Sequence, residues 1–245
     1  GLAGRVFKLH DAQANGSDET VKGASFDAKT GSVTVPARTV AVFTQAAGDR
    51  IDPTVTPDPD TAQWVASGDG RWWLRYPDGS YPANERVVRD GVTYSFDANG
   101  WMKTGWQVED GAWRYYAPSG AMASGWTAVG GTWYYLDPDT GAMATGWLKD
   151  GDTWYYLHDS GAMATGWVNL GGAWFYLNGN GSMATGWANL GGTWYYLTES
   201  GQMAIGWVKD GGSWYFCHPS GAMATGRVVI GGTAYTFDGS GRWVA

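Results

Sequence analysis

The stretch GWVKDGGSWYF at residues 206–216, followed by GAMATG at residues 221–226, is one copy of a motif that recurs along most of the chain. Trp207 and Trp214 stand seven residues apart in it, with a glycine-bearing turn between them. Strand-forming residues flank the turn, so the motif predicts a β-hairpin. A single hairpin is marginally stable in water, and we therefore expect successive copies to stack on one another.

The motif repeats with a period of 20 residues and a single 21-residue step. The extra residue falls in DPDTG at residues 137–141, where a turn can absorb it without disturbing the strand register. Six copies carry both tryptophans: Trp106 and Trp113, Trp126 and Trp133, Trp147 and Trp154, Trp167 and Trp174, Trp187 and Trp194, and Trp207 and Trp214.

All seven methionines occupy one position, in the connection that follows each hairpin. They are Met102, Met122, Met143, Met163, Met183, Met203 and Met223. Methionine is flexible and fills irregular gaps, so we expect a packing role; contact with the open side of a tryptophan pair is the alternative role.

Atypical copies stand at both ends of the array. Arg86 and Thr93 take the places of the two tryptophans in an early copy. At the far end Arg227 and Ala234 replace both, and Trp243 takes the methionine position. Stacked arrays need such terminal copies as caps, so we predict an all-β solenoid of stacked β-hairpin repeats.

The chain divides into three parts. Residues 64–245 carry the array, residues 48–63 form a Pro/Asp-rich linker, and residues 1–47 contain none of the repeat. In the front part, a proline divides two alternating apolar runs over residues 32–43, as in a bent edge strand. Because so few residues cannot form an independent sandwich, we expect a short β-sandwich remnant that completes a sheet begun elsewhere.

The composition excludes several classes of function. Seventeen Trp, 14 Tyr and 39 Gly stand against 16% charged residues, and the formal net charge is −7. An acidic chain without a basic run disfavours nucleic acid. No apolar stretch approaches the roughly 20 residues of a membrane helix, so we predict no membrane insertion.

The residues that commonly carry chemistry have ordinary explanations. Cys217 occupies the leucine position of its copy, which predicts a small buried hydrophobe. His10, His158 and His218 lack metal-ligand spacing. Most aspartates sit in turns, and nothing indicates the paired carboxylates of a glycosidase. We therefore predict a non-catalytic chain with no metal and no cofactor.

The repeat closely resembles the cell-wall-binding, or choline-binding, repeat of Gram-positive surface proteins. The resemblance covers residues 64–245 and rests on both tryptophans, the WYY run and the GAMATGW connection in register. It implies a left-handed solenoid in which the choline of teichoic acids binds between neighbouring hairpins. A related set of repeats in glucansucrases binds α-glucan instead.

The front part resembles the end of the C-terminal β-sandwich of pullulanases and related α-amylase-family enzymes. The motifs are FKLH at residues 7–10, QANG at residues 13–16 and VPARTVAVF at residues 35–43. This resemblance implies that the chain is a fragment of a starch-debranching glycoside hydrolase whose catalytic part lies outside it.

Strand alternation indicates how a binding box would form. Trp133 and Tyr135 point to one face of their strand, while Leu136 points to the other, which we expect to be the core. Trp126 joins Trp133, and Tyr156 of the next copy would close the third side, in agreement with the family pattern of two aromatics from one hairpin and one from the next. The expected third aromatics of the first five boxes are, in order, Tyr135, Tyr156, Tyr176, Tyr196 and Phe216. Thr236 stands at this place for the sixth box, which we therefore predict to bind weakest.

Such a box suits a quaternary ammonium, because aromatic faces carry negative quadrupole charge. A hexose face stacks on the same rings, and a third interpretation gives the tryptophans only a structural role between hairpins. We predict a non-catalytic module that attaches a starch-degrading enzyme non-covalently to the bacterial cell envelope, through choline or another group of an envelope glycopolymer. The predicted location is extracellular, at the cell surface. The alternative is an α-glucan-binding module that holds starch near the catalytic domain.

Overall fold

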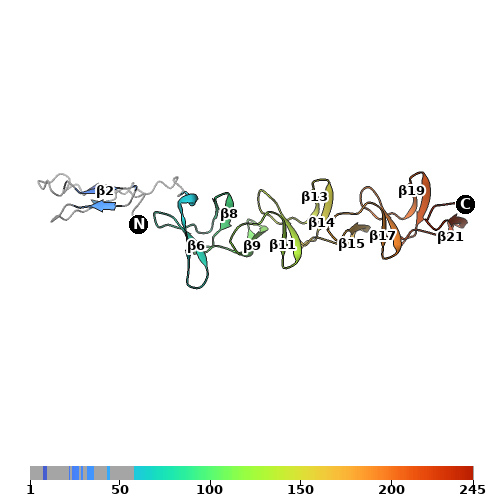
Figure 1. Ribbon diagram of the computed structural model, residues 1–245, viewed down its shortest axis with the longest axis horizontal. Helices are drawn as coiled ribbons and strands as arrows, with labels where there is room; N and C mark the ends of the chain where they lie inside the picture. Colours follow the sequence, from blue (N-terminus) through green and yellow to red (C-terminus); the bar gives the residue numbers. More distant parts are fainter. Residues whose placement is uncertain are drawn as a thin grey trace. The chain divides into compact units, whose positions relative to one another are not determined.

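The computed structural model describes residues 58–244 continuously and, before them, residues 8–9, 22, 24–27, 29, 32–35 and 43–44. In these residues the secondary structure consists of two-stranded antiparallel sheets, apart from single β-bridges such as that between Leu157 and Met163 and 3-10 turns such as η2 (Pro59–Thr61) (Figure 1). The predicted all-β architecture of repeated hairpins is confirmed.

Four short strands belong to the front part. β1 (Lys8–Leu9) pairs with β4 (Phe43–Thr44), and β2 (Ser25–Asp27) pairs with β3 (Ser32–Thr34). The rest of the expected sandwich remnant and most of the expected linker lie outside the described residues.

The chain comprises two compact units, residues 1–123 and residues 124–245. The hairpins of the first unit are β5 (Gln63–Ala66) with β6 (Trp72–Arg75), β7 (Arg86–Arg89) with β8 (Val92–Ser95), and β9 (Gly105–Glu109) with β10 (Ala112–Tyr116). Those of the second unit are β11 (Gly125–Val129) with β12 (Thr132–Leu136), β13 (Gly146–Asp150) with β14 (Thr153–Leu157), β15 (Gly166–Leu170) with β16 (Ala173–Leu177), β17 (Gly186–Leu190) with β18 (Thr193–Leu197), β19 (Gly206–Asp210) with β20 (Ser213–Cys217), and β21 (Gly226–Ile230) with β22 (Thr233–Phe237).

The turns explain the glycines between the paired tryptophans. In β11–β12 the two turn residues, Gly130 and Gly131, have φ angles of 59° and 84°. Positive φ at both positions defines the hairpin turn whose twist matches that of the strands, and glycine adopts it without strain. Asp110 and Gly111 serve the same purpose in β9–β10, with φ angles of 52° and 75°.

The strand register separates a core face from an aromatic face, as predicted. In β13–β14, Trp147 lies opposite Tyr156, and Trp154 is two residues before Tyr156, so these three rings share one face. Leu157 points to the other face and is fully buried. The same position is fully buried in every hairpin from β9–β10 to β19–β20, with Cys217 in the last of them. Burial raises the pKa of the Cys217 thiol to about 11, which agrees with the predicted packing role.

The methionine connections join hairpins of the second unit to one another. After β13–β14, the backbone N–H of Met163 donates to the carbonyl of Trp133 in the preceding hairpin at 2.8 Å, while Ala164 donates to Tyr156 of its own hairpin. Met183, Met203 and Met223 repeat this pattern. Each connection therefore bonds two successive hairpins and fixes their spacing.

Each of these methionines packs against a glycine of the following copy, and this packing leaves no room for a side chain at the glycine. Gly181 has a φ of 84°, and a Cβ there would lie 2.3 Å from the sulfur of Met163. The same conflict would arise at Gly161, Gly201, Gly221 and Gly241 with the methionine of the preceding copy. This contact explains why glycine precedes the methionine position by two residues along the array.

Candidate ligand-binding boxes

The box of Trp147 shows how two successive hairpins build a cavity. Trp147 on β13 and Trp154 on β14 stand perpendicular, with ring centroids 6.3 Å apart and an interplanar angle of 88°. Phe175 on β16 of the next hairpin forms the third side, with its centroid 5.0 Å from that of Trp147. The resulting cavity of about 360 Å³ is lined by Trp147, Trp154, Phe175, Met183, Glu199 and Ser200.

The box of Trp126 has the same construction. The centroid of Tyr155 on β14 lies 4.7 Å from that of Trp126 on β11. The cavity of about 300 Å³ is lined by Trp126, Trp133, Tyr155, Met163, Gly179 and Asn180. Methionine therefore has both roles considered from the sequence, because it joins hairpins and also lines the box.

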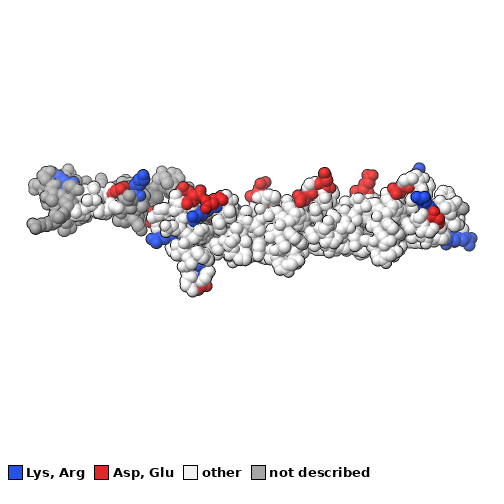
Figure 2. Space-filling model, in the orientation of Figure 1, with Lys and Arg blue, Asp and Glu red and all other residues white. Residues whose placement is uncertain are grey.

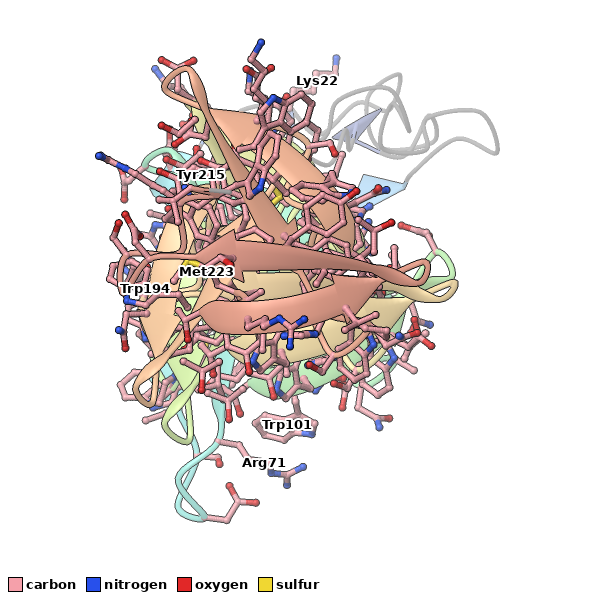
Figure 3. The ribbon with its side chains drawn as sticks, turned by 90° about the vertical axis from the view of Figure 1, so that its right-hand side faces the viewer. Lys22, Arg71, Trp101, Trp194, Tyr215 and Met223 are labelled. Atoms are coloured by element: carbon pink, nitrogen blue, oxygen red, sulfur yellow. The ribbon has the colours of Figure 1, made fainter. Side chains whose placement is uncertain are left out.

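The next two boxes follow the pattern. Trp167 and Trp174 are perpendicular at 6.4 Å, and Tyr195 lies 4.9 Å from Trp167. Tyr215 lies 4.7 Å from Trp187. Figure 3 shows the members of this last box, Trp194, Tyr215 and Met223, close together at one edge of the molecule; Met223 donates its N–H to the Trp194 carbonyl.

The expected third aromatic residue is wrong by one position in each of these boxes. Tyr156 does not reach back to Trp126 and Trp133; its ring lies 5.2 Å from Trp147 of its own hairpin. The reason is the strand alternation: Tyr156 shares the aromatic face of its hairpin, whereas the opposite face, which carries Tyr155, meets the preceding hairpin. The other four expected residues also pack on the first tryptophan of their own hairpins: Tyr135 on Trp126, Tyr176 on Trp167, Tyr196 on Trp187, and Phe216 on Trp207.

The sixth box is complete, contrary to the expectation based on Thr236. Trp207 and Trp214 are perpendicular at 6.3 Å, and Tyr235 lies 5.0 Å from Trp207. Trp243, at the methionine position, lies 6.0 Å from Trp207. These four residues line a cavity of about 330 Å³, so the reason for predicting the weakest binding here does not hold.

The tryptophans are only partly used in packing between hairpins. Trp154 remains 41% exposed, and Trp133, Trp174, Trp194 and Trp214 are similarly exposed. Rings that served only to join hairpins would be buried between them. Figure 2 shows the second unit as a surface with few charged atoms, which is the setting of these exposed rings.

Two boxes have a carboxylate bonded to their first tryptophan. The indole N–H of Trp126 donates to Asp150 at 3.0 Å, and that of Trp187 donates to Asp210 at 3.1 Å. Burial, followed by the charges of Asp210 and Glu199, raises the pKa of Tyr196. The local potential around these rings therefore favours a cation over an anion.

The first unit contains one complete tryptophan pair. Trp106 and Trp113 are perpendicular at 6.4 Å, and Tyr115 of the same hairpin lies 5.1 Å from Trp106. Near β6, the face of Trp101 is covered by the Arg71 guanidinium at 3.9 Å, as the lower part of Figure 3 shows. That ring already holds a cation supplied by the chain itself.

A polar cluster replaces the aromatic box in β7–β8 and β9–β10. Arg86 and Thr93 occupy the tryptophan positions, as predicted, and Arg114 stands where later hairpins supply the third aromatic. Arg86 pairs with Asp110 at 2.7 Å. The cavity here, of about 420 Å³, is lined by Asn84, Glu85, Arg86, Ser95, Lys103, Val108, Glu109 and Asp110.

Glu109 is the centre of this polar cluster. It accepts hydrogen bonds from Ser95 at 2.5 Å, Tyr116 at 2.7 Å and Lys103 at 2.9 Å. Burial opposes ionisation of Glu109, but these bonds outweigh it and hold the pKa of the carboxyl below its usual value. Burial and the bond to Glu109 raise the pKa of Tyr116 to about 12.

Metal binding and membrane insertion by a helix gain no support from the described part of the chain. No group of three or more His, Cys, Asp or Glu side chains there has the geometry to hold a metal ion. None of the helices in those residues has the length and apolarity needed to span a membrane.

Sequence reasoning missed the residues that lie across the box from the tryptophan pair. Tyr155 and its equivalents were not among the predicted site residues, because they share the face of the leucine that was expected to be the core, although that face meets the preceding hairpin. Glu199 and Asn180 were not among the predicted site residues. The signal that could have found them is the head-to-tail stacking of identical hairpins, which must bring the core-side face of each copy against the aromatic face of the one before.

Comparison with known families agrees with this geometry. A family model for the choline-binding repeat matches residues 86–125, 123–165 and 164–206, and a second model, for a cell wall binding repeat, matches residues 205–223. Residues 1–46 match a model for the C-terminal part of pullulanase-type α-1,6-glucosidases. A search of curated proteins gives no match.

Solved structures of Streptococcus pneumoniae proteins resemble the array. CbpJ is 30% identical, with a TM-score of 0.58, over 75% of this chain and 94% of that chain. Choline binding protein F, solved in the presence of a peptidoglycan analogue, is 37% identical, with a TM-score of 0.63, over 71% and 70%. The choline-binding domain of CbpL is 32% identical, with a TM-score of 0.55, over 76% and 98%. This chain therefore belongs to the family of choline-binding repeat proteins.

Proposed function

We propose that the tryptophan boxes bind the choline groups of a cell-envelope polymer. The observation that carries this proposal is the three-sided apolar cavity formed by Trp147, Trp154 and Phe175. A trimethylammonium group has a positive charge spread over methyl groups, so it gains both ring electrostatics and apolar burial in such a cavity. The carboxylates of Asp150 and Asp210 and the net charge of −7 add an attraction of the right sign.

The repetition of the boxes supports a polymeric partner. One cation on aromatic faces contributes about 0.5–2 kcal/mol, so each box alone binds weakly. Several boxes that engage a polymer with repeated ligands raise the overall affinity by a factor on the order of 10²–10⁴ where their geometry permits simultaneous binding. The array is therefore suited to attachment at a cell surface, in an extracellular location.

The front part supports a more specific role. Residues 1–46 match the C-terminal part of pullulanase-type enzymes. We infer that the array attaches a starch-degrading glycoside hydrolase to the cell envelope. The alternative of α-glucan binding by the array gains no support from the comparisons, and α-glucan serves below as the control ligand.

Parallel titrations with choline and maltoheptaose, followed by tryptophan fluorescence, test this proposal. We expect choline to change the emission saturably, because it covers half-exposed indole rings, and maltoheptaose to have little effect. Sedimentation with purified choline-bearing cell walls, and release by free choline, is the matching test for the polymer. Saturable binding of maltoheptaose without a response to choline would overturn the proposal.

A further inference from the structure

The boxes of the second unit differ in the turn residues that line them. The cavity of the Trp147 box includes Glu199 and Ser200, whereas that of the Trp126 box includes Gly179 and Asn180. These residues come from the turn two hairpins further along, and Glu199 and Gly179 occupy the same position in their copies. At this position similar aromatic walls are therefore combined with a glutamate in the Trp147 box and with a glycine in the Trp126 box.

The turn that carries Glu199 is held in place by its own hydrogen bonds. The N–H of Gly201 donates to the carbonyl of Thr198 at 2.8 Å, and the N–H of Gln202 donates to the Thr198 hydroxyl at 3.1 Å. The hydroxyls of Thr198 and Ser200 lie 2.8 Å apart. The backbone that positions the carboxylate is thus fixed before any ligand arrives.

We infer that Glu199 makes the Trp147 box selective for charge, so that this box prefers a quaternary ammonium over an uncharged molecule of the same shape more strongly than the Trp126 box does. This inference rests on the proposed function. The walls of both boxes recognise shape and apolar surface. Only the Trp147 box has a carboxylate among its lining residues, because the Asp150 carboxylate accepts the indole N–H of Trp126 and stands outside the lining of the Trp126 cavity. Lys149, opposite Trp154 in the strand register, is exposed and lies outside the lining of this cavity.

The expected size of the effect follows from the exposure of Glu199 to solvent. Two unit charges about 4–5 Å apart in water interact by about 1 kcal/mol, which corresponds to roughly a three- to fivefold change in affinity. Salt screens an exposed interaction of this kind, so the selectivity decreases as ionic strength rises.

The methionines provide a separate reporter for each box. Met183 lines the Trp147 box and Met163 lines the Trp126 box. With ¹³C-methyl-labelled methionine in the full chain, the two methyl signals give a dissociation constant for each box in one titration. The probes are choline and its uncharged isostere 3,3-dimethylbutan-1-ol.

Two reciprocal variants test the inference. Glu199→Gln should raise the choline dissociation constant read at Met183 about three- to fivefold and leave the constants at Met163 and for the isostere unchanged. Gly179→Glu should lower the choline constant read at Met163 by a similar factor. Position 179 accepts this change, because a Cβ there meets no atom within 4 Å and its φ lies outside the range that disfavours side chains.

The outcomes separate the two proposals. If choline shifts both methyl signals but neither variant alters its dissociation constants, the inference about Glu199 is wrong and the proposed function stands. An equal loss of choline and isostere binding in Glu199→Gln would also overturn the inference, because it would indicate a steric role. If choline shifts neither methyl signal in the unmodified chain, the proposed function itself fails.

Discussion

The polar cluster around Glu109 and the aromatic box of Trp147 occupy the same place in the repeat. In the first, the three box positions carry Arg86, Thr93 and Arg114, and the charged groups pair with one another. In the second, the corresponding rings leave an open apolar cavity. The difference shows that the same hairpin backbone accepts either charged or aromatic side chains at these positions. A box is free to bind a ligand only where its side chains do not already pair with one another.

The largest effect should come from removing the centre of the polar cluster. Glu109→Ala leaves Lys103, Ser95 and the buried hydroxyl of Tyr116 without their acceptor, which should lower the free energy of unfolding by about 2–4 kcal/mol. Choline binding read at Met183 should not change. Urea denaturation followed by circular dichroism checks the stability; a loss below about 0.5 kcal/mol would show that the cluster contributes little.

Removing a wall of the aromatic box should reduce binding more than stability. Trp154→Ala removes a half-exposed wall and should cost about 1–3 kcal/mol of choline binding at that box, with a smaller effect on unfolding than Glu109→Ala. Binding to choline-bearing cell walls should fall further than binding to free choline, because a gap in the row reduces avidity. If the variant keeps its fold and loses neither activity, the tryptophans are only structural.

Acid should weaken the polar cluster and leave the aromatic frame of the Trp147 box in place. The pKa of Glu109 is lowered in the folded chain, so its stabilising contribution is fully present above the unfolded value of about 4.5 and is lost as the pH falls through the folded pKa. The loss should be smaller than in Glu109→Ala, since a protonated carboxyl still forms hydrogen bonds. Urea midpoints measured between pH 7 and pH 3 should fall less in Glu109→Gln than in the unmodified chain; equal slopes would contradict this assignment.

The smallest effect concerns the terminal box, where an indole replaces the methionine. Trp243→Ala should weaken choline binding at Trp207 and Trp214 by about 0.5–1 kcal/mol, because Tyr235 and both tryptophans remain. Trp243→Met is the matched control and should restore the residue type of the other boxes. The indole ¹⁵N–H signal of Trp207 reports the binding, and an unchanged affinity in Trp243→Ala would exclude Trp243 from the site.

The sequence was sufficient to predict the hairpins, their register and the tryptophan pairs, because glycine turns and alternating rings repeat with a fixed spacing. The face of each residue, such as Trp133 against Leu136, followed from alternation alone. The partner of each face did not, because it depends on how one hairpin is rotated onto the next; this is why Tyr156 was assigned the place that Tyr155 takes. Glu199 reaches a box two hairpins away, a relation that local spacing does not encode.

A crystal structure of the chain soaked with choline tests the central claim most directly. We expect a trimethylammonium group between Trp147, Trp154 and Phe175, with its methyl groups against the three rings and beside Met183. The same arrangement should recur between Trp126, Trp133 and Tyr155. Empty boxes at a choline concentration that saturates the fluorescence change, or choline bound elsewhere on the surface, would contradict the account.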